Sequence, residues 1–141
     1  MAVETTNLGT WEYNTQNARL YCSMESRKIC GMPADMDPDI EVLFEHIHTE
    51  DKDYFLQQIK KAVDPVGEGR FDIHLRFHRY DNKEVRWARA QGKVFFDSNL
   101  FPERLIGTML DVTEEKTREQ ELRESVELFQ TMADNVPAMI W

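Results

Sequence analysis

The chain has 141 residues, of which 41% are hydrophobic and 30% charged, which is enough for one core of ordinary size but hardly for two. Its 17 Lys and Arg against 26 Asp and Glu give a formal net charge of −9, which repels phosphate groups, so we expect no nucleic-acid partner and no direct membrane contact. The sequence has neither a run of roughly 20 apolar residues nor a signal peptide, and its two thiols are Cys22 and Cys30. We therefore expect a cytoplasmic domain with reduced thiols, whose parent protein could still be membrane-anchored.

The first part of the chain predicts a β-hairpin. Residues 8–14 place Trp11 and Tyr13 on one face at a period of two, and residues 19–23 form a second short strand after a polar turn. Residues 1–7 are expected to be a leader or residues foreign to the natural chain.

Short helices are expected next, because the hydrophobic spacing changes from two to the three and four of a helix. The first ends at Gly31, the second begins at Ile40 after Asp37-Pro38, and the third begins with Thr49 as its N-cap. The third helix is expected to bury Phe55, Ile59, Ala62 and Val63.

Long strands follow the helices. Residues 71–78 alternate apolar with polar side chains, and residues 85–96 return as the antiparallel partner. The turn between them contains Asn82, which tolerates the left-handed backbone that a hairpin needs, and Gly92 is expected to mark a bulge or kink. A last strand over 104–112 completes the pattern, which predicts an antiparallel sheet with helices on one face.

From Thr113 the composition shifts to Glu, Lys, Arg and Gln, and opposite charges at a spacing of four support an exposed helix. Apolar residues then recur at spacings of four and three, which forms a short heptad seam. The members of this seam are Leu122, Val126, Phe129, Ala133 and Val136. We expect the seam to pair two copies of the chain weakly, or only within a longer protein.

Several segments resemble, in the right order over 8–116, a PAS domain with the PAC motif at its carboxyl end. They are Gly9–Tyr13 in the first strand, Ile47–Asp51 at the start of the third helix, Arg79–Asp81 with Arg86 and Trp87 around the central hairpin, and Gly107 with Asp111–Lys116. The last segment is the most specific, because it resembles the Asp-Ile-Thr-Glu-Arg-Lys signature that joins a PAS core to its output helix. The residues from Leu122 to Trp141 resemble the beginning of another PAS domain.

The resemblance implies an α+β fold, in which a five-stranded antiparallel sheet carries helices on one face and is followed by a C-terminal signalling helix. It divides the chain into a PAS/PAC sensor domain over 8–112, a linker or signalling helix over 113–134, and the start of a second, truncated PAS domain over 135–141.

Such domains detect a signal or a small ligand and relay it to an effector, so the resemblance implies a piece of a bacterial sensor histidine kinase in a two-component system. The fragment itself is expected to catalyse nothing, because it has no nucleophile–base pair and no phosphate-binding glycine loop. The alternatives are a ligand-free dimerisation and relay module, the PAS domain of a diguanylate cyclase, and a small metal-dependent enzyme. The expected partners are a second copy, through the C-terminal helix, the sheet or both, and an effector domain of the same chain.

Asp111 and Thr113 are the residues through which we expect the sheet to be coupled to the helix. Thr113 could cap the helix through its hydroxyl, while Asp111 bonds nearby backbone or a basic side chain. The alternative is that both residues merely end a strand and begin a helix.

Small side chains in the later strands predict a cavity that could hold a small ligand. They are Ala88, Ala90, Gly92, Gly107 and Thr108. The alternative is a fully packed core, in which Trp11, Phe44, Phe55 and Trp87 fill the space above them.

The cofactor is not identified by the sequence. His46, His48, Glu50 and Asp51 are metal-ligand types in a cluster, but they lack the HExxH spacing, so no metal site is expected. Cys30 lacks the Asn-Cys-Arg-Phe-Leu-Gln run of light-sensing relatives, and no histidine stands at a haem position of the family. The resemblance therefore disfavours both a flavin adduct and haem.

Overall fold

The computed structural model describes residues 7–140, and for residues 135–140 it describes the backbone alone. The chain forms two compact units, which divide between Asp111 and Val112. The first unit contains a sheet with helices, and the second unit is a single helix.

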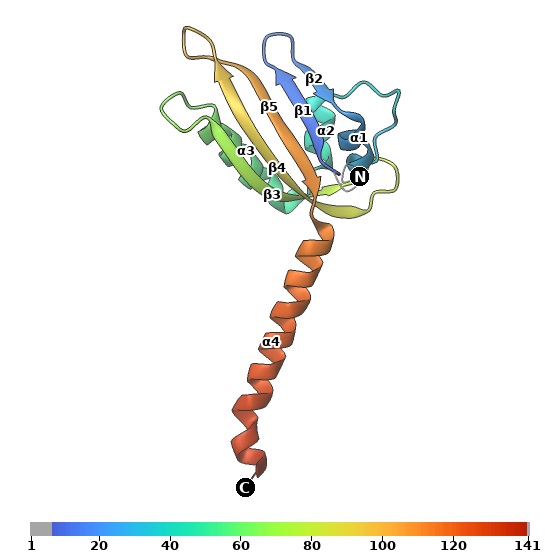
Figure 1. The fold of residues 1–141 in the computed structure, drawn as a ribbon, viewed down its shortest axis with the longest axis vertical. Helices are drawn as coiled ribbons and strands as arrows, with labels where there is room; N and C mark the ends of the chain where they lie inside the picture. Colours follow the sequence, from blue (N-terminus) through green and yellow to red (C-terminus); the bar gives the residue numbers. More distant parts are fainter. Residues whose placement is uncertain (1–6, 141) are drawn as a thin grey trace, which may run out of the picture. The chain divides into compact units, whose positions relative to one another are not determined.

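The described part of the first unit has five strands in one antiparallel sheet, in the order β2-β1-β5-β4-β3 (Figure 1). They are β1 (Gly9–Asn14), β2 (Arg19–Cys22), β3 (Arg70–His78), β4 (Val85–Phe96) and β5 (Pro102–Asp111). This confirms the predicted sheet and both predicted hairpins. The last strand is central, so β5 joins the first hairpin to the second.

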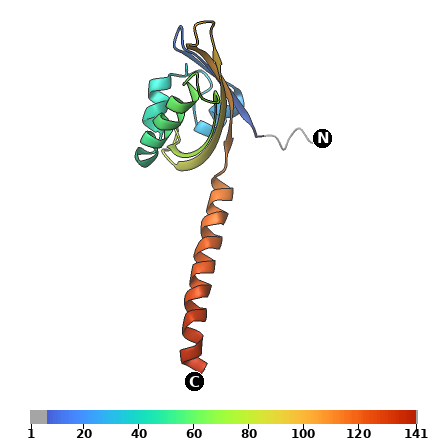
Figure 2. The same ribbon diagram turned by 90° about the vertical axis from the view of Figure 1, so that its left-hand side faces the viewer.

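The helices of the first unit cover one face of this curved sheet (Figure 2). They are α1 (Met24–Cys30), α2 (Ile40–His46), the short 3-10 helix η2 (Thr49–Asp51) and α3 (Lys52–Ala62). The sequence patterns explain α1 directly: Ser23 accepts a hydrogen bond from the backbone N–H of Ser26, and Gly31 ends the helix with a φ of 70°. The predicted helix end at Gly31 is therefore confirmed.

The expected N-cap at Thr49 is wrong by one residue. His48 occupies the N-cap position of η2, and its ring Nδ1 accepts a hydrogen bond from the backbone N–H of Glu50 at 3.1 Å. Asp51 occupies the N-cap position of α3. It makes no side-chain cap hydrogen bond, because its carboxylate binds Arg76 of β3 instead.

Two details of the central hairpin also differ from expectation. Lys83, and not Asn82, has the left-handed backbone, with a φ of 63°, while the Asn82 side chain accepts a hydrogen bond from the Glu84 N–H at 2.9 Å. Gly92 pairs regularly with both neighbouring strands, and the register shift of β4 lies between Phe95 and Phe96. Gly92 is required for close packing, as described below, and not for a bulge.

The core lies between the helices and the inner face of the sheet. Alternation along β3 buries Phe71, Ile73, Leu75 and Phe77, and turns the polar residues outward. On the helical side, Phe55 and Ile59 of α3 pack against the same cluster. Burial of each such side chain contributes about 1.5–3 kcal/mol, so this face of β3 supplies much of the stability of the unit.

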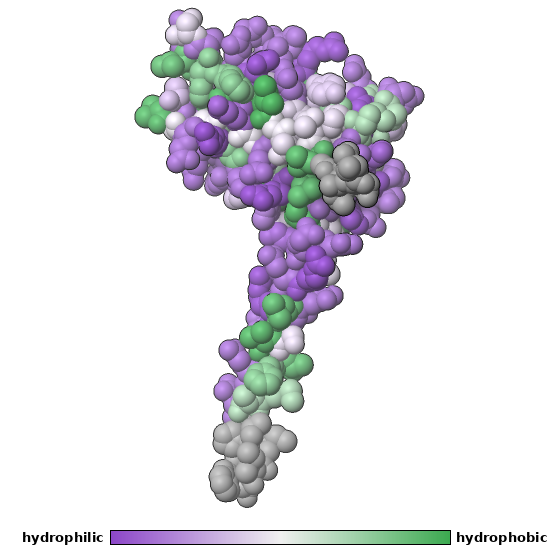
Figure 3. Space-filling view, in the orientation of Figure 1, coloured by the Kyte–Doolittle hydropathy of each residue, from purple (hydrophilic) through white to green (hydrophobic). Residues whose placement is uncertain are grey.

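The second unit is α4 (Thr113–Ile140), a helix of 28 residues. Leu122, Val126 and Phe129 of the predicted seam are exposed, and Figure 3 shows hydrophobic side chains along the helix beyond its hydrophilic first turns. The Val136 side chain lies outside the described residues, and the backbone of 135–140 continues α4. The expected boundary of a second domain at 135 stays a prediction. None of the helices described is long and apolar enough to cross a bilayer.

Candidate functional site

A cavity of about 300 Å³ lies between the inner face of the sheet and the helices. Ala88 and Ala90 of β4 line it from the sheet, where their small side chains leave room. Phe55 and Ile59 of α3 and Leu43 of α2 line it from the helices. Two of the five residues predicted for a cavity therefore reach it.

The other three predicted cavity residues lie elsewhere. Gly92, Gly107 and Thr108 line a separate open depression, together with Asp72 and Gln91. Because Thr108 and Gln91 are opposite each other in the register, their side chains share the outer face of the sheet.

The glycines Gly92 and Gly107 give their inner-face space to two aromatic rings. Trp11, Gly107, Gly92 and Phe71 stand in one row across four strands, and the Trp11 and Phe71 rings stack with centroids 5.8 Å apart. A Cβ on Gly92 would overlap the Phe71 ring, and a Cβ on Gly107 would overlap the Trp11 ring. The aromatic side chains of the flanking strands fold over the glycines. This part of the core is therefore fully packed, which was the stated alternative to a cavity.

The lining of the cavity is almost wholly apolar, and three of its polar side chains, those of Ser26, Thr15 and His46, are bonded to protein. The hydroxyl of Ser26 donates to the carbonyl of Thr10 at 2.8 Å, and the hydroxyl of Thr15 donates to the carbonyl of Pro102 at 2.7 Å. His46 makes a hydrogen bond of 2.8 Å through its Nδ1 to the carbonyl oxygen of His78. Among the lining residues, none carries a charged carboxylate, ammonium or guanidinium group.

Tyr80 also lines the cavity, and the sequence reasoning missed its role. Among the buried side-chain N and O atoms of the described residues, its hydroxyl oxygen is the one without a hydrogen-bond partner. A signal was available: Tyr80 comes two residues after the end of a strand and lies inside the segment Arg79–Asp81. That position alone does not say which way the ring points.

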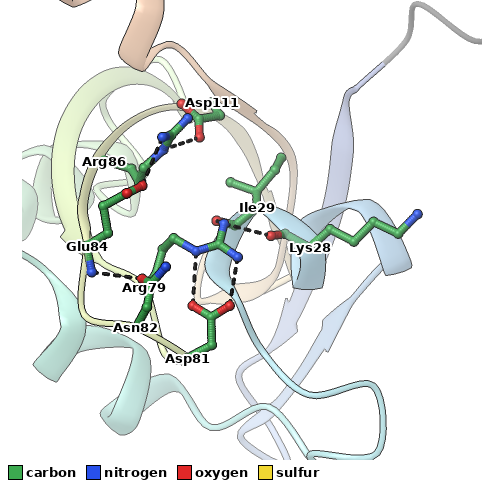
Figure 4. Close-up of polar contacts among 8 residues, drawn as sticks. All are labelled: Lys28, Ile29, Arg79, Asp81, Asn82, Glu84, Arg86 and Asp111. Carbon is green, nitrogen blue, oxygen red and sulfur yellow. Dashed lines mark hydrogen bonds and ion pairs between the residues drawn. The ribbon is translucent and has the colours of Figure 1, made fainter.

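The turn that follows Tyr80 is fixed to the end of α1 by an arginine (Figure 4). The guanidinium of Arg79 donates to the carbonyl oxygens of Lys28 and Ile29, both at 3.1 Å. The same group binds both carboxylate oxygens of Asp81 at 3.0 Å, and the carboxylate raises the pKa of Arg79. Because Arg79 is held on two sides, the turn and α1 form one connected structure.

A second arginine connects this turn to the last residue of β5. The Arg86 Nε donates to the Asp111 carboxylate at 2.9 Å, and its Nη1 donates to the Glu84 carboxylate at 2.9 Å. Hydrogen bonding to Asp111 is the main cause of the raised pKa of Arg86. Figure 4 shows Arg86 between the two carboxylates, with Glu84 also bonded through its N–H to Asn82. Asp111 therefore binds a basic side chain, one of the two partners considered for it.

Thr113 occupies the first position of α4. The carbonyl of Val112 accepts a hydrogen bond from the N–H of Lys116 at 2.9 Å, which places Val112 at the N-cap. Thr113 is therefore the residue after the N-cap of α4, and not the N-cap that was expected.

The histidines and acids that resemble metal ligands bind other protein groups. His48 accepts from the Glu50 N–H, and Asp51 accepts from the Arg76 guanidinium at 2.7 Å. His46 stacks on Tyr80, with ring centroids 3.7 Å apart. Across residues 7–134, where side chains are described, no group of three or more His, Cys, Asp and Glu is arranged to hold a metal ion.

Comparison with known proteins agrees with this architecture. The family model of the PAS fold matches residues 19–109. A blue-light-activated histidine kinase of Brucella anthropi is 25% identical over 119 residues, which covers 83% of this chain and 23% of that protein. The chain thus spans less than a quarter of the length of this relative.

Solved structures give the same result. A sensory box histidine kinase/response regulator from Burkholderia thailandensis has a TM-score of 0.76 and 26% identity, over 92% of this chain and 95% of that one. The N-terminal domain of a diguanylate cyclase with a PAS/PAC sensor from Marinobacter aquaeolei has a TM-score of 0.67 and 22% identity, over 77% of this chain and 98% of that one.

Proposed function

Because the chain belongs to the PAS-fold family and forms a sensory PAS domain, we propose that it is the sensor of a larger signalling protein and acts through α4 on an effector. A histidine kinase is the preferred effector, since both the Brucella and the Burkholderia proteins are named as such kinases. A diguanylate cyclase is the second candidate, because the Marinobacter domain is named as part of one.

One observation carries the proposed relay: the end of β5 is bonded to the same turn that borders the cavity. Tyr80 and Met109 line the cavity, and each is within two residues of a member of the arginine network. A shift of the turn changes the Glu84–Arg86 contact, and Arg86 passes the change to Asp111. Only Val112 then separates Asp111 from the first residue of α4.

This relay predicts a large effect of Arg86→Gln and Asp111→Asn. The test protein is a fusion of residues 1–134 to a histidine-kinase core, joined so that the heptads of α4 continue into the first helix of the kinase. We expect each change to alter the rate of autophosphorylation of this fusion by about fivefold or more. Asp111→Asn keeps the size of the side chain, Arg86→Gln shortens it but keeps it polar, and each removes one charge of the pair. The measurement is the initial rate of phosphate incorporation from labelled ATP.

Arg89→Gln is the matched control for this experiment. Arg89 also lies on β4 and forms a 2.7 Å ion pair with Asp72, but both side chains are more than two-fifths exposed on the outer face. Its loss is expected to leave the rate within about twofold, since exposed pairs contribute little. Equal rates in all the variants, with folding intact, would contradict the relay.

We further propose that two copies pair through the apolar seam of α4. The seam side chains Leu122 and Phe129 are 67% and 72% exposed, which is unfavourable for large apolar groups unless a partner covers them. Their spacing of seven residues places them on one side of the helix.

The pairing predicts that Phe129→Asp weakens the dimer by about tenfold or more, because it buries a charge in an apolar seam. Sedimentation equilibrium of the 141-residue chain measures this. Leu128→Asp is the control: Leu128 is 62% exposed but lies about 120° from the seam. Equal weakening by both substitutions would point to a different interface.

We propose that the cavity does not hold a flavin in a cysteine adduct or a haem. Its thiols are Cys22 and Cys30, and burial, with Cys22 close by, raises the pKa of Cys30 to about 12. A thiol buried in this way is a poor ground-state nucleophile, because its environment disfavours the thiolate. A volume of about 300 Å³ is also small for either cofactor. The two buried, unpaired thiols further support a reducing, cytoplasmic setting.

A further inference from the structure

The unbonded hydroxyl of Tyr80 needs an explanation, because a buried polar group without a partner costs free energy. Burial raises the pKa of this hydroxyl, with Cys30 as the next cause, so it keeps its proton at neutral pH. Tyr80 lines the cavity, and its buried hydroxyl is a hydrogen-bond donor that no atom of the described residues accepts from.

Tyr80 is also held in place before anything binds. Its backbone N–H donates to the carbonyl of Cys30 at 2.8 Å, which attaches it to the end of α1. Its ring lies flat on the ring of His46, with centroids 3.7 Å apart and planes within 5°. A donor held in this way loses little conformational entropy when an acceptor binds to it.

The volume and the lining of the cavity indicate the size and the charge of a ligand that it could hold. An apolar cavity of roughly 150 Å³ holds one benzene ring. The cavity of about 300 Å³ therefore accommodates about two fused rings. No charged side chain lines it, so an ionised ligand would be buried without a counter-charge. Water is a poor occupant, because the other polar groups described above already bond to protein.

We propose that this cavity binds a neutral, mostly apolar molecule of about two rings, whose single hydrogen-bond acceptor, such as a carbonyl oxygen, bonds to the Tyr80 hydroxyl. This ligand class rests on the proposed sensory function, since it states what the sensor detects. Ligand binding would also be the first step of the relay. Tyr80 lies between Arg79 and Asp81, which bond to each other, so an acceptor that binds the Tyr80 hydroxyl would shift this turn.

The test compares two probes of nearly equal size: 1-indanone, which carries a carbonyl acceptor, and indane, which carries none. The Kd of each is measured by NMR titration of the 141-residue chain, as wild type, Tyr80→Phe and Tyr21→Phe. The Kd of indane divided by that of 1-indanone is expected to be about tenfold higher for wild type than for Tyr80→Phe. This ratio cancels the different hydration of the two probes.

Tyr21→Phe is the control, because Tyr21 is 62% exposed and outside the cavity, and it is expected to keep the wild-type ratio. Equal ratios in all three proteins overturn the assignment of Tyr80. Should Tyr80→Phe not fold, nuclear Overhauser contacts between 1-indanone and the Tyr80 ring of the wild type decide: their presence supports the assignment, and binding without them overturns it.

Ala90→Leu tests the cavity itself, since the larger side chain fills it and is expected to abolish binding of both probes. Binding that survives this change, or folded wild type that binds neither probe, overturns the ligand class. These measurements need no kinase and do not depend on any change in α4, so they are independent of the autophosphorylation test. A failure of the ligand class is therefore distinguishable from a failure of the relay.

Discussion

Gly107→Ala is expected to lower the free energy of unfolding by about 3 kcal/mol or more, at the upper end of the range for overpacked cores. A Cβ at this position would overlap the backbone carbonyl oxygen of Gln91 and also the Trp11 ring. A ring can turn aside, but the carbonyl belongs to β4, the neighbouring strand, so the sheet itself must move. Urea denaturation followed by tryptophan fluorescence and circular dichroism measures the loss.

The neighbouring positions give an expected order of effects. The nearest atoms to a Cβ on Gly92 are ring atoms of Phe71 and Trp11 and not backbone, so Gly92→Ala is expected to cost about 1–2 kcal/mol. Thr108→Ala changes a side chain on the outer face and is expected to cost about 0.5 kcal/mol or less. A Gly107 variant no less stable than the Thr108 variant would show that the strands are not so closely apposed.

The order of strands and helices could be predicted because each element depends on local spacing. The period of two over 71–78, the helix stop at Gly31 and the polar composition after Thr113 all appear as expected. The errors are local as well. His48 caps the helix in place of Thr49, because a ring nitrogen also accepts a hydrogen bond, which the residue preferences for caps do not anticipate.

The site was less predictable, because it depends on which strands are neighbours. Asp111 was identified by its signature, but its partner Arg86 is 25 residues away and meets it only because β4 and β5 pair. The same pairing sets Gly92 opposite Gly107, so that small residues expected to leave a cavity are covered by rings. Ala88 and Ala90, which also lie on the inner face of β4, line the cavity instead.

A second large effect is expected at Asp51, which fixes the start of the helices that cover the cavity. Its carboxylate accepts hydrogen bonds from the Arg76 backbone N–H at 2.7 Å, from Nε at 3.0 Å and from Nη2 at 2.7 Å. These bonds, to a side chain that is 14% exposed, hold η2 and α3 against β3. Asp51→Asn is expected to cost about 2 kcal/mol at pH 7, because hydrogen bonds to charged groups are lost.

The cost of Asp51→Asn is expected to depend on pH. Hydrogen bonding to Arg76 lowers the pKa of Asp51 in the folded state, so its stabilising effect is complete above the unfolded pKa of about 4 and disappears as the pH falls through the lower folded value. The wild type and the variant should therefore converge in stability below about pH 4. Urea denaturation between pH 7 and pH 2 measures the difference.

Asp72→Asn separates this effect from the general response of carboxylates to acid. Arg89 also lowers the pKa of Asp72 by hydrogen bonding, but that pair is exposed, so its loss is expected to cost about 0.5 kcal/mol or less at any pH. Because Phe55 and Ile59 of α3 line the cavity, acid should also weaken binding there before the sheet unfolds. A pH-independent difference between Asp51→Asn and wild type would contradict this account and assign the cost to packing alone.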